Sequence, residues 1–95
     1  MPYFVVTREP GAGWDRERPL REQAGWDEHA AFMDELADSG LIVLGGPLGG
    51  GPTAMHIVEA GSQAEVRTRL DEDPWEPMGV LHTVSIEPWE ILLRR

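Results

Sequence analysis

The feature that most constrains the fold is the order in which strand-like and helix-like segments follow one another along the chain. Four segments are rich in aromatic, β-branched or uninterrupted apolar residues, as strands are: Tyr3–Thr7, Leu41–Leu44, Thr53–Glu59 and Val80–Glu87. Two segments with helical periodicity separate them: Gly25 or Trp26 to Ser39, and Ser62 to about Glu72. The predicted order is β-α-β-β-α-β. This is the ferredoxin-like order of an α+β fold, in which two helices cover one face of an antiparallel sheet.

Glycine, proline and capping residues mark the ends of these segments. Gly40 stands where a C-terminal glycine cap belongs, and Ser62–Glu65 has the sequence of a capping box at the start of the second helix. Pro74 ends that helix, because the residue before a proline is pushed out of the helical region. The segment Arg8–Gln23 holds two prolines and two glycines among its charges and is predicted as a loop.

The turn between the two middle strands and the faces of the last strand can also be predicted. The glycine-rich run Gly45–Pro52 is predicted as a hairpin turn. A phosphate-binding loop is disfavoured there, because the run lacks the Lys-Ser/Thr ending and no helix follows it. Alternation in the last strand puts four side chains on one face, and Pro88 is expected to end the strand; the four are Val80, His82, Val84 and Ile86.

Two helices leave the second face of the sheet bare. Several apolar residues on that face would form an exposed patch, among them Phe4, Val6, Val43 or Leu81. The chain also ends in an apolar tail with no obvious place inside so small a domain: Trp89, Ile91 and Leu92. Pairing two sheets face to face, with the tail packed across them, would cover both. We therefore expect a homodimer, the commonest oligomer.

The composition narrows the class of protein. A length of 95 residues allows one domain, 1–95, with a small core. The absence of cysteine excludes disulfides, thiolate catalysis and cysteine-ligated metal sites, and it fits a cytoplasmic location. Met1–Thr7 lacks the basic start of a signal peptide, and the longest apolar stretch, Leu41–Leu48, is too short to span a membrane. A net charge of −9 with no lysine argues against a nucleic-acid partner.

One histidine stands in the apolar stripe of the first predicted helix. With about 100° between successive residues, one arc of this helix collects Trp26, His29, Ala30, Phe32, Met33, Leu36 and Ala37. His29 is therefore aimed at the sheet or at a pocket beside it. Two interpretations stay open: a buried histidine that serves packing alone, or a general acid or base, because imidazole titrates near neutral pH.

Asp73 is the candidate partner of His29. An aspartate before Pro74 can cap the short helical turn 74–77. A capped carboxylate is also held rigidly enough to orient a histidine, as carboxylates do in catalytic triads. The other histidines, His56 and His82, lie on predicted strands far from His29 in sequence. Three histidines without short ligand spacing do not indicate a metal site.

Several short pieces follow one another at characteristic spacings: Tyr3–Thr7, the helix with His29, Gly40, Gly46-Pro47, Asp73-Pro74, Gly79 and Ile86–Pro88. In this order they resemble the YCII-related (YciI-like) family of dimeric α+β-barrel proteins, nearly from end to end. The resemblance implies a ferredoxin-like fold dimerised through its sheets, with His29 and Asp73 as the active-site pair. The family includes a dehydrochlorinase of chlorinated aromatics, and its fold is similar to that of muconolactone isomerase.

The chain departs from this pattern at one position. Many members of the family carry an arginine three residues before the histidine, where this chain has Trp26. The predicted loop offers three arginines that could bring a guanidinium back into the site: Arg16, Arg18 and Arg21. Without such an arginine, an anionic substrate is disfavoured.

The leading interpretation is a small acid–base enzyme of the lyase, isomerase or dehydrochlorinase type that needs no metal or other cofactor. His29 would move a proton on a small cyclic or aromatic substrate, and Asp73 would orient the imidazole and balance its charge. An alternative from another class is a non-catalytic dimeric domain that binds a small ligand or a protein partner, with His29 and Asp73 holding the fold. A third interpretation is a cofactor-free oxygenase on the same fold.

Overall fold

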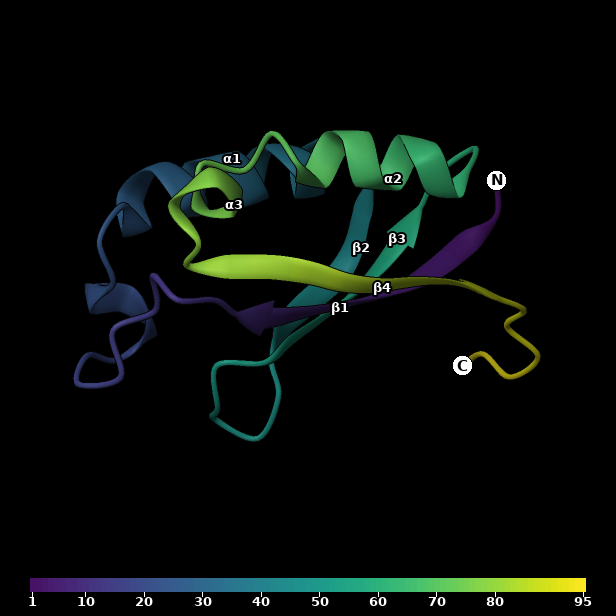
Figure 1. Cartoon of the computed structure of the whole chain (residues 1–95). Helices are drawn as coiled ribbons and strands as arrows, with labels where there is room; N and C mark the ends of the chain where they lie inside the picture. Colours follow the sequence, from purple (N-terminus) through teal and green to yellow (C-terminus); the bar gives the residue numbers. More distant parts are fainter.

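The computed structural model describes all residues, Met1–Arg95. Four strands form one antiparallel sheet: β1 (Tyr3–Pro10), β2 (Ile42–Pro47), β3 (Ala54–Glu59) and β4 (Leu81–Trp89). Three helices lie together on one face of this sheet (Figure 1): α1 (Trp26–Asp38), α2 (Gln63–Leu70) and α3 (Trp75–Met78). The strand order β2-β3-β1-β4 is the ferredoxin-like order. The predicted fold class is therefore confirmed.

The predicted helix caps are confirmed by their hydrogen bonds. At the end of α1, the N–H of Gly40 donates to Ala37 (3.0 Å) and that of Leu41 donates to Leu36 (3.1 Å). Gly40 has a φ of +87°, as this type of cap requires. At the start of α2, the backbone N–H of Glu65 donates to the Ser62 hydroxyl over 3.1 Å.

The first strand is longer than predicted. β1 continues through Arg8 to Pro10, and Arg8 stands opposite Ala54 on β3 and Thr83 on β4. The charged and turn-forming residues from position 8 onward favoured a loop, but the Arg8 side chain is fully buried and pairs with carboxylates beneath the helices. The loop itself follows Pro10 and contains one short 3-10 helix, η1 (Leu20–Glu22).

The strands on the two edges also differ from the prediction. β2 runs on to Pro47, so two glycines predicted in the turn lie inside the strand. The β2–β3 hairpin itself is confirmed, since the N–H of Leu48 donates to Thr53 over 2.8 Å. β4 extends past Pro88 to Trp89. A proline is tolerated there because β4 is an edge strand, with a second strand on one side only.

A bulge in β4 breaks the alternation that the sequence predicts for this strand. Thr7 stands opposite Ser85 and Arg8 opposite Thr83, so β4 carries one residue more than β1 at this point. The extra residue reverses which positions face the helices. Leu81 and Ile86 are consequently both buried, whereas Val84 is 51% exposed.

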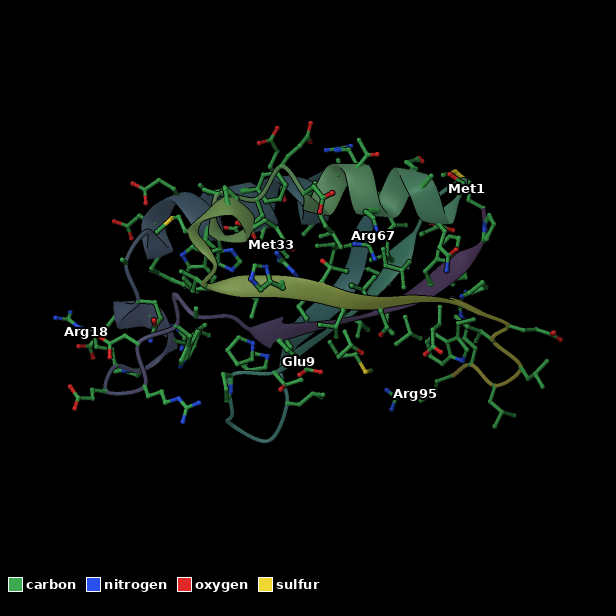
Figure 2. All side chains as sticks on the ribbon, viewed as in Figure 1. Met1, Glu9, Arg18, Met33, Arg67 and Arg95 are labelled. Carbon is green, nitrogen blue, oxygen red and sulfur yellow. The ribbon has the colours of Figure 1, made fainter.

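The core lies between the sheet and the helices. Three of the four residues that we expected on the bare face belong to this core instead. Phe4, Val6 and Leu81 are buried on the helix side, so only Val43 of the four expected residues is exposed. At the start of β1, Tyr3–Val6, both alternating sets carry large apolar or aromatic residues, so this stretch alone does not decide which set faces inward. Met33 lies between helix and sheet, whereas Glu9 lies on the opposite side (Figure 2).

The face without helices, here called the open face, carries the alternate residues of the two central strands: Tyr3, Val5, Thr7, Glu9, Met55, Ile57 and Glu59. The C-terminal tail turns back toward it, where the Arg94 guanidinium donates to the Tyr3 hydroxyl over 3.0 Å. None of the helices combines the length and apolar composition that crossing a bilayer requires. The cytoplasmic location stays a prediction.

Candidate active site

The structure brings the two predicted site residues together. His29 projects from α1, and Asp73 lies in the connection between α2 and α3. The His29 Nδ1 and Asp73 Oδ2 atoms are 2.8 Å apart, which is a hydrogen bond between groups separated by 44 residues. The Asp73 side chain is fully buried, and that of His29 is 9% exposed. His29 therefore does more than pack on the apolar stripe of α1, because its imidazole is bonded to a buried carboxylate.

Asp73 also has the capping role that the sequence predicts. Its Oδ1 atom accepts a hydrogen bond from the backbone N–H of Trp75 over 2.9 Å at the start of α3. The two carboxylate oxygens thus have different partners, since Oδ1 accepts from the backbone of α3 and Oδ2 is bonded to His29. The cap fixes the direction from which the carboxylate meets the imidazole.

A buried arginine completes the cluster, and sequence reasoning missed it. The Arg8 Nη1 atom donates to Asp73 Oδ2 over 2.8 Å, and Nη2 donates to Glu76 Oε2 over 3.0 Å. None of the three loop arginines lines the cavity of His29: Arg16 lies elsewhere on the surface, Arg18 pairs with Asp15, and Arg21 lies over the Trp26 ring. Once the structure shows that Phe4 and Val6 face inward, the two-residue spacing places Arg8 on the same buried face.

The contacts keep both carboxylates ionised. Burial by itself would raise the pKa of Asp73, but the hydrogen bonds from His29, Trp75 and Arg8 together lower it below its ordinary value. Burial likewise opposes the shift at Glu76, where hydrogen bonds from Arg8 and His82 lower the pKa. At neutral pH the cluster therefore contains two anions around one buried cation, and Asp73 is available as an acceptor for the His29 N–H.

Tryptophan side chains fix the plane of the His29 ring. The Trp75 indole stacks on the imidazole with 3.8 Å between ring centroids and 8° between planes. Trp75 is itself held, because its Nε1–H donates to the carbonyl oxygen of Ala24 over 2.8 Å. Trp26 lies against the same imidazole at a centroid distance of 5.7 Å. With one nitrogen bonded to Asp73 and one face covered by Trp75, the imidazole has a single well-defined orientation.

A cavity of about 440 Å³ opens beside this ring, between α1 and β2. Its walls are mainly apolar, and they include Trp26, Met33, Ile42 and Leu81 together with His29 and His56. The Nδ1 atom of His29 is bonded to Asp73, and this is the one side-chain hydrogen bond that the imidazole makes within the chain. The volume is sufficient for a small organic ligand, and the unbonded nitrogen of His29 is a reactive group available to it.

His56 is a second histidine of this cavity that sequence reasoning did not select. Burial, followed by the nearby charge of Arg8, lowers the pKa of His56 from 6.5 to about 4. Between these values the unfolded chain binds a proton that the folded protein does not. The associated stability is therefore full above pH 6.5 and is lost as the pH falls toward 4.

Replacing His56 should make the free energy of unfolding less sensitive to acid. From pH 7 to pH 4, the free energy of unfolding should fall by about 3 kcal/mol more in the wild type than in His56→Gln. Chemical denaturation at several pH values measures the difference between the two proteins. Parallel curves for the wild type and His56→Gln would contradict the assignment.

A solved structure of a known enzyme is similar to this chain. The chain is similar to 5-chloro-2-hydroxyhydroquinone dehydrochlorinase from Burkholderia phenoliruptrix AC1100, solved in complex with 2,5-dihydroxybenzoquinone. The two share 28% sequence identity over 93% of each chain, with a TM-score of 0.62. A comparison with curated proteins found no match. The sequence matches the YCII-related domain over residues 2–90. With nearly its whole length matched, the chain belongs to the YCII-related family.

Proposed function

We propose that this protein is a small-molecule enzyme that moves a proton on a cyclic or aromatic substrate, with His29 as the acid–base group and Asp73 as its orienting partner. One observation carries the proposal: a buried, ionised carboxylate binds Nδ1 of an imidazole that lines a mainly apolar cavity and whose Nε2 has no partner within the chain. In this arrangement the proton of the neutral ring sits on Nδ1, which leaves the Nε2 lone pair to act as a base.

The chemistry follows from that lone pair. His29 Nε2 takes a proton from a hydroxyl or carbon of the bound ring, and the electron pair left behind moves into the ring. In an elimination the imidazolium first returns this proton to the chlorine-bearing ring carbon, and removal of a second hydroxyl proton then drives an electron pair through the ring that expels chloride, with net loss of HCl. In an isomerisation the imidazolium returns the proton to another carbon. Asp73 stabilises the imidazolium between the two steps. Each step transfers only protons and electron pairs, so the proposal calls for no cofactor.

The charges around the site favour an uncharged substrate. Arg8 does bring a guanidinium to the site, but both of its terminal nitrogens are bonded to carboxylates. Its charge is therefore already balanced, and the cavity offers a substrate no unpaired cation. A neutral ring with an acidic hydroxyl suits these walls better than a carboxylate does.

The similar dehydrochlorinase acts on a chlorinated hydroxyhydroquinone, and this supports the choice of a test reaction. A panel of chlorinated hydroquinones and catechols is incubated with the protein while released chloride and hydrogen–deuterium exchange at ring carbons are measured. We expect chloride release or exchange on at least one ring. Tight binding of a ring without either reaction would contradict the enzyme and support a non-catalytic ligand-binding domain.

We also propose that the protein is a homodimer formed through the open face. The helices leave this face uncovered, and exposed apolar side chains border it, including Leu44 (62% exposed) and Trp89 (43%). The tail that turns toward Tyr3 adds two more, Leu92 and Leu93. A second copy of the same face supplies a matching apolar surface, as two-fold pairing requires.

A charge in the open face is expected to break the dimer. The wild type should sediment at twice the 10.6 kDa of the chain, whereas Met55→Arg should shift the equilibrium toward monomer by at least about tenfold. Met78→Arg is the matched control, because Met78 lies on the helix side and is already 44% exposed. A monomeric wild type, or equal effects of the two variants, would contradict the proposed interface.

A further inference from the structure

His56 differs from the other polar groups around the cavity, because the chain gives it no partner. The residue is 7% exposed, and neither Nδ1 nor Nε2 makes a hydrogen bond. It lies on β3 opposite Val6 of β1 and Gly45 of β2, on the side of the sheet that faces the helices. It also lines the cavity that His29 lines. Buried polar groups are nearly always bonded, so an unpaired imidazole beside a cavity calls for a partner from outside the chain.

The neighbouring strand is shaped around the His56 ring. A Cβ atom placed on Gly45 would lie 2.1 Å from His56 Nδ1, so the imidazole fills the space that a side chain at position 45 would take. Both nitrogens are shielded from solvent in this position. A leucine or phenylalanine would fill the same space without leaving polar atoms unpaired.

We infer that His56 is the second polar contact of the substrate, turning toward the cavity to exchange a hydrogen bond with a ring oxygen while His29 takes the proton. The inference rests on the proposed function and adds a substrate class to it: a small six-membered ring with at least two oxygen substituents. One oxygen or its neighbouring carbon faces His29 Nε2, and another oxygen meets His56. The pKa of His56, lowered to about 4, keeps its imidazole neutral at pH 7, so it can donate or accept this bond.

The test measures the affinity of the protein for phenol and for the three benzenediols. In the wild type, the best benzenediol should bind about tenfold more tightly than phenol, as one added hydrogen bond predicts. In His56→Phe, which keeps an aromatic ring but no nitrogen, this preference should disappear. His56→Gln, which keeps a donor and an acceptor, should restore part of it. His82→Gln should leave the preference unchanged.

The outcomes separate this inference from the proposed function. If the wild type binds these rings and His56→Phe keeps the full preference for the diol, His56 is not the second contact, and the proposed function stands. If the wild type binds neither phenol nor any benzenediol, the proposed substrate class fails and the inference fails with it. If His56→Phe binds phenol as the wild type does and loses only the diol preference, the inference is supported.

Discussion

Replacing His29 by glutamine is expected to lower the turnover of the active ring by about 10²- to 10⁴-fold. Glutamine is similar in length and can still donate to Asp73 and pack against Trp75. It cannot take up a proton near neutral pH, so the proton transfer at the cavity is lost while the hydrogen bond that supports α1 is kept. The size of the effect is that of a general base removed from an otherwise intact site.

Initial rates at saturating substrate measure this effect, on whichever ring the wild type converts. The control is His82→Gln, which removes an exposed histidine outside the cavity and should retain the wild-type rate. Circular dichroism and thermal unfolding establish that His29→Gln is folded. A folded His29→Gln variant with a rate within about threefold of the wild type would exclude His29 as the acid–base group.

A substitution at His29 can lower activity without a large loss of stability, whereas a substitution at Asp73 affects both. Asp73 binds His29, pairs with Arg8 and caps α3. An Asp73→Ala variant therefore loses stability whether or not the residue serves catalysis. Asp73→Asn is more informative, because it keeps an acceptor for the Trp75 N–H. It should lower turnover by a similar factor to His29→Gln, since an amide next to Nδ1 no longer fixes the protonated state of that nitrogen.

Replacing Arg8 by methionine is expected to lower the free energy of unfolding by about 3–5 kcal/mol at pH 7. Methionine fills much of the same space but leaves Asp73 and Glu76 without their shared cation. Both carboxylates have a pKa below the ordinary value in the folded protein. The stability that they contribute is present above their unfolded pKa and is lost as the pH falls through their folded pKa. In Arg8→Met, burial acts on both carboxylates without the opposing contacts of Arg8, so the variant protonates them at a higher pH than the wild type does, and the cost of the substitution should shrink as the pH is lowered toward 4.

Chemical denaturation at pH 7 and pH 4 tests this expectation. Arg18→Met is the matched control, because Arg18 and its partner Asp15 are 60% and 47% exposed. Removing that surface pair should cost less than about 1 kcal/mol. A loss for Arg8→Met no larger than that for Arg18→Met would show that the buried pairs do not hold this region together. A loss that grows at low pH would contradict the ionised state of the carboxylates.

Much of the fold and half of the site could be predicted, because local signals specify them. The caps at Gly40 and Ser62 act through bonds to residues a few positions away, and the helical stripe of α1 locates His29. Asp73 was selected for its position before Pro74, and its cap on Trp75 is again a local bond. Signals of this kind are complete within about ten residues of sequence, so the element order follows from them.

The rest depends on pairing between distant segments, which local patterns do not encode. Arg8 has the composition of a loop residue until Asp73 and Glu76, more than sixty positions away, neutralise it. The bulge in β4 exists only relative to β1, and it decides that Leu81 and Ile86 share a face. His56 became a candidate only once β3 lay beside Gly45 and α1 closed the cavity.

The most direct test of the account is the protonation of the two His29 ring nitrogens by ¹⁵N NMR at about pH 9, where imidazole is neutral. Asp73 accepts from Nδ1 in the proposed arrangement, so the wild type should carry its proton on Nδ1 and show an unprotonated Nε2. In Asp73→Asn this preference should weaken or reverse. A wild-type ring protonated on Nε2, or one whose protonation does not respond to Asp73→Asn, would contradict a base held ready by Asp73.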